Sequence, residues 1–283
     1  MLLDITWNVN PEIFSIGTFS VRWYGLLFAL GFLVGQQIMT KVYKTEHMPE
    51  KDLDSLMLTM VLSTVIGARV GHYVFYEWEG FLADPLHWLV EMILPPYSGL
   101  ASHGATIGIL SGLAFYAIRK KQYFLWVVDR IVITVALGGC FIRLGNLMNS
   151  EIVGKPADVP WAFRFMRNTE YLPVVPRHPA QLYEAITCLI LCFLLYGIWK
   201  KYKEATPHGL LLGIFLIWIF GLRFLYEFLK ENQEGFESTM SFNMGQILSV
   251  PAILLGIYFL WFALSKKRTG AYINKPQTEE QEA

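Results

Sequence analysis

The feature that most constrains this chain is a series of seven apolar stretches, each of roughly 20 residues. That is the length a helix needs to cross a bilayer core of about 30 Å. Only 16% of the 283 residues are charged and 54% are hydrophobic, whereas charged residues make up about a quarter of soluble domains. The sequence therefore predicts an all-α polytopic membrane protein with seven transmembrane helices. The stretches are residues 21–41, 54–77, 98–118, 126–147, 179–199, 209–230 and 244–265.

The composition gives no sign of a nucleic-acid partner or a bound cofactor. The formal net charge is zero, so no overall field attracts nucleic acid. Cys140, Cys188 and Cys192 lie inside apolar stretches and match no zinc-ligand spacing, which favours small core residues. The sequence also lacks a P-loop and a metal-ligand cluster. We therefore expect no cofactor, no metal and no nucleic-acid partner.

Basic residues are distributed unevenly between the segments that join the stretches. Residues 78–97 and 231–243 contain acidic residues but neither Lys nor Arg. By the positive-inside rule, the N-terminus lies outside and the C-terminus lies in the cytoplasm. The basic clusters follow the first, third, fifth and seventh stretches, at Lys41, Lys44 and Lys51, at Arg119, Lys120 and Lys121, at Lys200, Lys201 and Lys203, and at Lys266, Lys267 and Arg268.

Residues 148–178 must then be external, although they carry four basic residues. Their proline and aromatic content predicts a small folded cap. We expect a single transmembrane catalytic domain over residues 1–268 that includes this external cap. A polar, disordered cytoplasmic tail over residues 269–283 would follow it.

Polar residues gather at the helix ends that the predicted orientation places outside. A charged residue at a helix centre costs roughly 2.5–3.5 kcal/mol, so such residues are usually functional. Guanidinium groups bind phosphate through two parallel hydrogen bonds, and the phosphate found at the outer leaflet is that of a phospholipid head group. We infer a phospholipid-binding site there. The residues are Tyr24, Arg69, His72, Tyr76, His103, Arg143, Asn146, His178, Gln181, Glu184, Arg223, Glu227 and Gln246.

The densest part of this set is the segment 138–154. Arg143 and Asn146 close the fourth stretch, and Asn149 and Glu151 follow within a few residues. Helical spacing puts Arg143, Asn146 and Asn149 on the same side. The alternative interpretation is a polar helix end followed by a glycine turn.

Other candidates also have structural alternatives. Arg223 and Glu227 are spaced i to i+4, so they can neutralise each other along one helix. Arg69 and Glu227 can serve as packing contacts, and His103 can be a hydrogen-bonded core histidine. Asp129 and Arg130 lie at the cytoplasmic start of the fourth stretch, where we interpret them as an interface pair.

Glycines recur every four residues in the second and third stretches. Small residues at this spacing let helices approach closely within lipid. The structural interpretation is therefore favoured for Gly67, Gly71, Gly104, Gly108 and Gly112.

Residues 142–154, IRLGNLMNSEIVG, resemble the signature of the prolipoprotein diacylglyceryl transferase family, usually written G-R-x-G-N-F-x-N-x-E-x-x-G. Two positions differ, because Ile142 replaces the first Gly and Leu147 replaces the Phe. The family tends to have a Tyr one turn before the arginine of the sixth stretch, where this chain has Ile219 and Phe220, and Tyr226 can partly substitute. Further matches spread the resemblance over nearly the whole chain, at residues 67–69, 75–76, 102–104, 177–184, 223–227 and 244–249.

The resemblance implies transfer of the diacylglyceryl group of phosphatidylglycerol to the lipobox cysteine of a prolipoprotein signal peptide, in the bacterial inner membrane. This first step of lipoprotein maturation forms a thioether and releases glycerol phosphate. A base such as His103 would take the thiol proton, while Arg143 and Arg223 stabilise the departing phosphate. These three are the expected catalytic residues. The expected phosphatidylglycerol-binding residues are Arg143, Asn146, Tyr24, Arg69, Glu151, Glu227 and Gly154.

Two other classes of membrane protein fit parts of the pattern. A transporter of a small anionic solute would also have polar residues in its helices. We would then expect broken helices near the midplane and an inverted repeat, and neither is visible in the sequence. An intramembrane protease needs a Ser–His or paired Asp arrangement. Ser102 adjoins His103 on one helix, and Asp129 has no partner at its depth. The transferase is the preferred interpretation and the transporter is the alternative.

Overall fold

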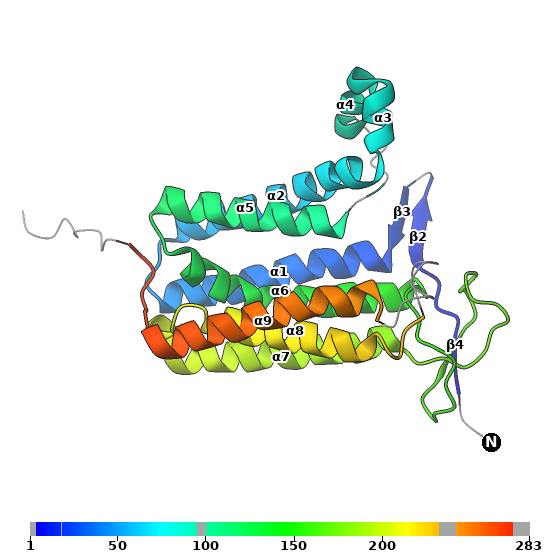
Figure 1. Ribbon diagram of the computed structural model, residues 1–283. Helices are drawn as coiled ribbons and strands as arrows, with labels where there is room; N and C mark the ends of the chain where they lie inside the picture. The colour runs from blue at the N-terminus through cyan, green and yellow to red at the C-terminus, as the bar shows by residue number, and fades with distance from the viewer. Residues whose placement is uncertain (1–3, 18, 95–98, 100, 232–241, 274–283) are drawn as a thin grey trace, which may run out of the picture. The chain divides into compact units, whose positions relative to one another are not determined.

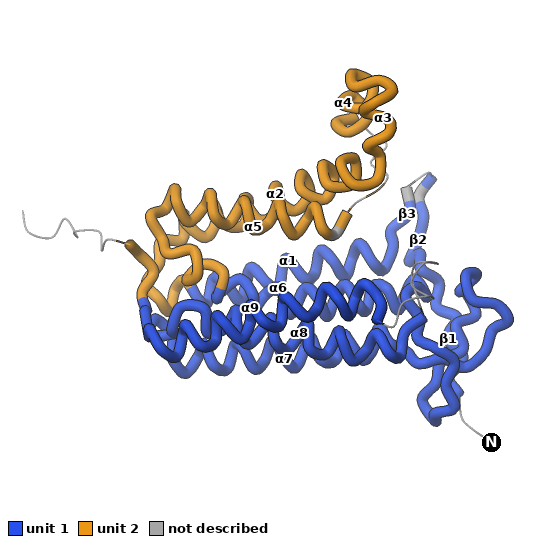
Figure 2. The backbone as a smooth tube through the Cα atoms, in the orientation of Figure 1, with its two compact units in different colours: residues 1–42, 129–269 blue, residues 43–128, 270–283 orange. Residues whose placement is uncertain are grey.

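The computed structural model describes residues 4–17, 19–94, 99, 101–231 and 242–273. Its contacts divide the chain into two compact units (Figure 2). Unit 1 comprises Met1–Val42 and Asp129–Thr269, and unit 2 comprises Tyr43–Val128 and Gly270–Ala283. The start of the predicted tail at residues 269–283 is paired with residues 121–122, since Tyr272 forms a bridge with Gln122 and the N–H of Ile273 donates to the Lys121 carbonyl at 3.0 Å. Residues 274–283 lie outside the described residues.

The protein is a mostly helical membrane protein, and a helix lies at each of the seven predicted stretches. Helices α1, α2, α6, α7 and α9 are long and apolar enough to cross a membrane. Helix α8 is apolar but has 17 residues, and α5 contains His103 and ends in Arg119 and Lys120, which lower its mean hydropathy. Five of the predicted spans are thus supported by length and composition. The helices are α1 (Trp23–Thr45), α2 (Glu50–Tyr76), α5 (Ser102–Lys120), α6 (Phe124–Met148), α7 (Ala180–Tyr202), α8 (Leu210–Tyr226) and α9 (Met244–Lys266).

Helix α8 ends four residues before the predicted boundary at residue 230. It stops at Tyr226, and the chain then turns so that Lys230 forms an antiparallel bridge with Gly154. The backbone N–H of Lys155 donates to the carbonyl of Leu229 at 2.8 Å. The prediction was wrong here because a tertiary backbone pairing, which local sequence does not reveal, takes the place of the last helical turn.

Unit 1 also contains short strands, so the expectation of an all-α fold needs correction. Strand β1 (Ile5–Trp7) runs parallel to β4 (Phe163–Phe165), and β2 (Glu12–Ile16) runs antiparallel to β3 (Phe19–Arg22). Residues 149–179, which join α6 to α7 and are called the cap below, contain β4. Leu147 at the end of α6 forms a buried cluster with Val153, Phe163 and Phe165 of the cap. Trp7 of β1 packs against this cluster. The Trp7 and Phe163 rings stack with centroids 5.3 Å apart.

Small residues lie at several contacts between the helices of unit 1. A Cβ at Gly213 of α8 would lie 2.7 Å from the backbone nitrogen of Leu260 in α9. Gly31 and Gly35 of α1 face Phe141 and Thr134 of α6 at van der Waals distance. Helix α7, in the same unit, also packs against α8. The cap lies at one end of these helices (Figure 1).

Unit 2 is organised by the contact between α2 and α5, as the glycine spacing predicts. A Cβ at Gly71 would lie 2.4 Å from Cα of Gly104, and one at Gly67 would lie 2.6 Å from the Gly104 carbonyl oxygen. The two backbones touch at these positions, so the structural interpretation of the glycines is confirmed. Two short helices, α3 (Trp78–Ala83) and α4 (Pro85–Ile93), follow α2.

Asp129 and Arg130 are fully buried in unit 1, so their interpretation as an interface pair was wrong. Asp129 accepts hydrogen bonds from the backbone nitrogens of Gly209 at 2.6 Å and Leu212 at 2.8 Å. Its carboxylate therefore satisfies N–H groups at the start of α8, which have no partner within that helix. Arg130 Nη2 donates to the carbonyl of Lys203.

Candidate active site

A chain of hydrogen bonds fixes the guanidinium of Arg143 at the end of α6. Its Nη1 donates to Oδ1 of Asn146 at 3.3 Å, and Nδ2 of Asn146 donates to Oε1 of Glu151 at 2.7 Å. The same carboxylate oxygen accepts a hydrogen bond from Asn149 at 3.3 Å. The predicted cluster in the segment 138–154 is therefore real, and Glu151 is its anchor.

The backbone after α6 turns sharply so that Glu151 can face back toward the helix. Ser150 and Ile152 adopt φ of 56° and 57°, in the left-handed region. The amide of Glu151 donates to the carbonyl of Asn146 at 3.1 Å. From α7, Nε2 of Gln181 donates to the Glu151 carbonyl at 2.6 Å. The turn is thus held by both α6 and α7.

Two carboxylates in unit 1 each hold one of the predicted catalytic arginines. Glu184 of α7 pairs with Nε of Arg143. Glu227, directly after α8, lies 3.6 Å from Nε of Arg223. Because both carboxylates contact the Nε side, the outer Nη edges of the guanidinium groups can take other partners, as Nη1 of Arg143 does with Asn146.

Glu227 is itself fixed by the start of α9. Oε2 of Glu227 accepts a hydrogen bond from Nδ2 of Asn243 at 3.0 Å, and Asn243 forms a capping box with Gln246. A Cβ at Gly245 would lie 2.8 Å from the Glu227 carboxyl carbon. A side chain at position 245 would displace this carboxylate, so Gly245 supports the position of Glu227 without entering the pocket.

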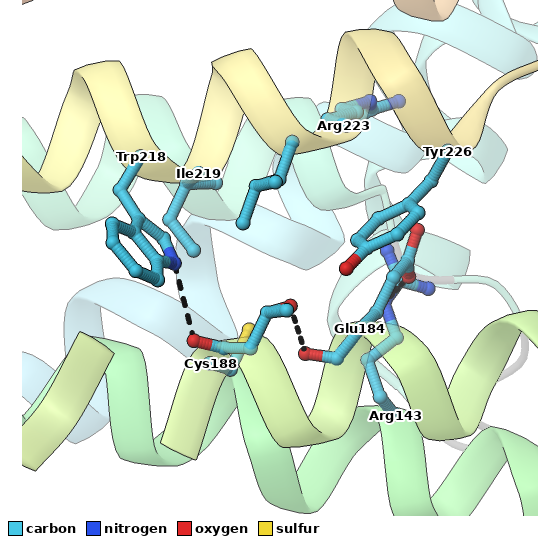
Figure 3. Close-up of a pocket in the computed structure, with 9 residues that line it drawn as sticks. Arg143, Glu184, Cys188, Trp218, Ile219, Arg223 and Tyr226 are labelled. Atoms are coloured by element: carbon cyan, nitrogen blue, oxygen red, sulfur yellow. Dashed lines mark hydrogen bonds and ion pairs between the residues drawn. The ribbon is translucent and has the colours of Figure 1, made fainter. Parts of the chain in front are cut away.

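A pocket of about 80 Å³ lies between α6, α7 and α8 (Figure 3). Arg143, Glu184, Arg223 and Tyr226 form its polar part. The side chain of Arg143 is 26% exposed and that of Arg223 is 44% exposed, so both can reach a ligand. The rest of the lining is largely apolar and comes from Thr187, Cys188, Trp218, Ile219 and Leu222. The pocket therefore joins a cationic end to an apolar wall, which suits a molecule with an anionic head and a hydrocarbon tail.

Two tyrosines lie near these arginines. Tyr24, at the start of α1, packs on Gly145, where a Cβ would lie 2.7 Å from the tyrosine ring. This contact holds Tyr24 near Arg143 and Glu151, whose charges act on its hydroxyl. Tyr226 lines the pocket from α8 (Figure 3). The sequence-based expectation that Tyr226 can supply a hydroxyl here agrees with this position.

Gly154 lies where the cap meets the segment after α8. Its N–H donates to the carbonyl of His178 at 3.0 Å, and a Cβ would lie 2.6 Å from that residue and 3.0 Å from the Leu229 carbonyl oxygen. Burial lowers the pKa of His178, so its ring is neutral at neutral pH and shares a hydrogen bond with the Tyr183 hydroxyl. This geometry gives Gly154 a packing role.

Comparison with known proteins identifies the family. The sequence profile of the prolipoprotein diacylglyceryl transferase family matches residues 11–262. The chain belongs to this family. The match includes the turn after α6, both arginine–carboxylate pairs and the start of α9. As a member of the prolipoprotein diacylglyceryl transferase family, the protein is a multi-pass membrane enzyme of lipoprotein maturation.

Three curated relatives illustrate how far the similarity extends. One from Chloroherpeton thalassium, named phosphatidylglycerol–prolipoprotein diacylglyceryl transferase, is 45% identical over 259 residues, which is 91% of this chain and 93% of that protein. A protein of the same name from Bacteroides fragilis is 43% identical over 279 residues, covering 94% and 98%. One from Vibrio cholerae is 35% identical over 257 residues, covering 89% and 91%.

The departure from the family signature at Leu147 has a simple structural context. Leu147 is buried among Val153, Phe163 and Phe165 of the cap, and its carbonyl accepts a hydrogen bond from Trp7 Nε1 at 3.0 Å. The side chain serves the core between α6 and the cap. Its replacement of the usual Phe therefore leaves the polar residues of the segment in place.

Two expected site residues, Arg69 and His103, belong to unit 2. Arg69 is buried, and its guanidinium donates to the carbonyls of Met92 at 3.0 Å and Glu91 at 2.7 Å. It also lies over the Tyr73 ring at 4.6 Å. These contacts tie α2 to the end of α4 and favour the packing alternative. His103 is exposed in the first turn of α5. Their participation in the site stays a prediction.

The sequence analysis missed one residue of the charged cluster, Lys230. Its Nζ contacts Glu184 and lies 3.4 Å from Glu227. The signal was present, because Arg223, Glu227 and Lys230 are spaced like residues on one helix face. Lys230 was placed at the end of a membrane span, where lysines usually extend into water. Glu184 was recognised at the correct helix end but not assigned to the site.

Proposed function

We propose that this enzyme transfers the diacylglyceryl group of phosphatidylglycerol to the lipobox cysteine of prolipoproteins. A bond forms between the cysteine sulfur and the terminal glycerol carbon of the diacylglyceryl group. The bond between that carbon and the phosphate oxygen breaks, and glycerol phosphate leaves. The thiol proton passes to a base. The observation that carries this proposal is the pair of arginines, each held by a carboxylate, at the polar end of an otherwise apolar pocket.

The arginines bind the lipid phosphate and stabilise the charge that grows on it as the carbon–oxygen bond breaks. Charge stabilisation by fixed donors is strong in a site that excludes water. Glu184 and Glu227 orient Arg143 and Arg223 by holding Nε, and Asn146 and Glu151 steady Arg143 from the other side. Tyr24 and Tyr226 offer hydroxyls to the glycerol head group. The apolar wall accepts an acyl chain.

The thiol requires a base because the thiolate, not the thiol, is the nucleophile. We assign this role to His103, at the start of α5. The neutral imidazole of a histidine can accept a proton from a thiol, and histidine is the most common general base in enzymes. The alternative is that the arginines alone stabilise the thiolate, in which case His103 is dispensable.

We assign the enzyme to the bacterial cytoplasmic membrane, with seven spans, the N-terminus outside and the C-terminus in the cytoplasm. The basic clusters support this orientation. The unit 1 residues also support a site at one leaflet, since Arg143 lies five residues before the end of α6, Glu184 lies in the second turn of α7 and Arg223 lies in the last turn of α8. With this orientation the site opens toward the outer leaflet, where signal peptides present their lipobox cysteine.

The test is an assay of the purified full-length protein with phosphatidylglycerol vesicles and a lipobox peptide. We expect the peptide mass to rise by one diacylglyceryl group, with one glycerol phosphate released for each modified peptide. A peptide with Ser in place of the lipobox Cys should stay unmodified. Neither product would form if the protein were a transporter of a small anionic solute, and that result would refute the proposal.

A further inference from the structure

Lys230 lies at the centre of the ion pairs but does not line the pocket. Its Nζ contacts Oε1 of Glu184 and lies 3.4 Å from Oε1 of Glu227. Its side chain is 3% exposed, compared with 26% for Arg143 and 44% for Arg223. A lysine this buried is costly unless it is paired. Here both partners are the carboxylates that hold the two arginines.

We propose that Lys230 is a positioning residue for the phosphate site. This inference rests on the function proposed above. Lys230 holds Glu184 and Glu227 on the buried side of the arginines, so neither carboxylate swings toward the outer Nη edges. Arg143 and Arg223 then present those edges to the lipid phosphate.

The charge balance of the site gives an independent reason. Arg143 and Arg223 contribute two positive charges, whereas Glu151, Glu184 and Glu227 contribute three negative charges. Without Lys230 the sum would be minus one, which repels an anionic phosphodiester. Lys230 brings the sum to zero. It does so from behind the carboxylates, so the positive ends of the arginines stay on the pocket side.

The backbone holds Lys230 in this place through the cap. Lys230 forms an antiparallel bridge with Gly154, whose missing side chain lets the segment approach. The next residue, Glu231, pairs with Arg177 Nη1 at 2.5 Å, and Arg177 also donates to the Gly154 carbonyl at 3.2 Å. The cap therefore fixes Lys230 from both sides along the chain. The signature glycine Gly154 therefore helps to position Lys230, because a side chain at 154 would push the segment that carries this lysine away from the cap.

The test compares Lys230→Met and Lys230→Arg with a matched control, Lys155→Met. Lys155 is exposed on the same bridge, and its Nζ donates to the Phe228 carbonyl rather than to a carboxylate. We expect Lys230→Met to raise KM for phosphatidylglycerol on the order of tenfold or more, because a buried charge pair is broken. KM for the lipobox peptide should change little. Lys230→Arg should keep most of the affinity, and Lys155→Met should match the wild type.

A double variant separates charge balance from simple loss of structure. Lys230→Met/Glu184→Gln removes one charge of each sign, so KM for phosphatidylglycerol should fall below that of Lys230→Met. A lower kcat in Lys230→Met with unchanged KM for the lipid, or no improvement in the double variant, would overturn the inference. Those outcomes leave wild-type transfer intact. Failure of the wild type to modify the peptide would instead refute the proposed function.

Discussion

At the scale of single residues, the site depends on how guanidinium groups are held. A carboxylate contacts the Nε of Arg143 and of Arg223, and both arginines line the pocket. A lysine carries the same charge but has no planar fork, so it cannot form two parallel hydrogen bonds to one phosphate. The arrangement therefore favours arginine for its shape as well as its charge.

Arg143→Lys tests this use of shape. We expect kcat/KM to fall by roughly 10²-fold, the usual effect of removing a fixed donor to a developing anion. The variant should fold normally, since Glu184 keeps a cationic partner. Arg167→Lys is a suitable control, because Arg167 is an exposed cap residue that donates to Asn8. Equal rates for Arg143→Lys and the wild type would exclude bidentate binding by Arg143.

His103→Gln tests the assignment of the base. Turnover at neutral pH should fall while KM for phosphatidylglycerol stays near the wild-type value. Raising the pH should restore part of the rate, because a free thiol with a pKa of about 8.5 ionises without help at higher pH. His87→Gln in the same unit, an exposed histidine paired with Glu91, serves as control. Identical pH–rate profiles for His103→Gln and the wild type would remove His103 from the mechanism.

At the scale of elements, helices pack where glycines let backbones touch. The contact of α2 with α5 in unit 2 and that of α8 with α9 in unit 1 both have backbone atoms at positions a Cβ would occupy. In lipid the hydrophobic effect does not drive helices together, so this close packing has to supply the attraction. The glycine spacing predicted that α2 and α5 each make a close helix contact, whereas the structure shows that they make it with each other.

Gly71→Ala should weaken the contact between α2 and α5. The new Cβ would lie 2.4 Å from Cα of Gly104, so the helices must separate. We expect a loss of about 1–3 kcal/mol, the usual cost of overpacking, seen as a lower midpoint of thermal unfolding in detergent. Gly197→Ala in α7 is the control, because nothing lies within 4 Å of its Cβ position. A Gly71→Ala midpoint at or above that of the wild type would contradict the packing.

The sequence allowed the helices to be located but not every end of them. Hydropathy follows burial in lipid, so apolar length was enough to find the α6 and α9 segments. The end of α8 depends on the bridge between Lys230 and Gly154, residues 76 positions apart, which no local pattern reveals. For the same reason Asp129 was interpreted as an interface residue, although it caps α8 from another helix. Polar contacts between residues far apart in the chain therefore could not be predicted from the sequence.

At the scale of the whole molecule, the proposed orientation makes a direct prediction. A membrane-impermeant maleimide should label Met166→Cys in the cap and Leu86→Cys in α4 while the cytoplasmic membrane is intact. Lys201→Cys, in the last turn of α7, should react only once the membrane is permeabilised. All three positions are exposed, and the native cysteines Cys140, Cys188 and Cys192 are buried, so background should be low. The reverse pattern would move the site to the inner leaflet.

The central claim is that the arginine pair holds the lipid phosphate during transfer, and the variant Arg223→Gln/Glu227→Gln tests it most directly. The two residues pair with each other, and Lys230, the other cation beside Glu227, keeps its contact with Glu184, so removing both charges leaves no buried charge without a partner. The measurement is the rate of peptide modification by phosphatidylglycerol, with thermal stability measured on the same sample. We predict normal production and a wild-type unfolding midpoint, but transfer as low as in Arg223→Gln alone. Transfer restored to the wild-type rate would show that Arg223 is part of the scaffold and would contradict the claim.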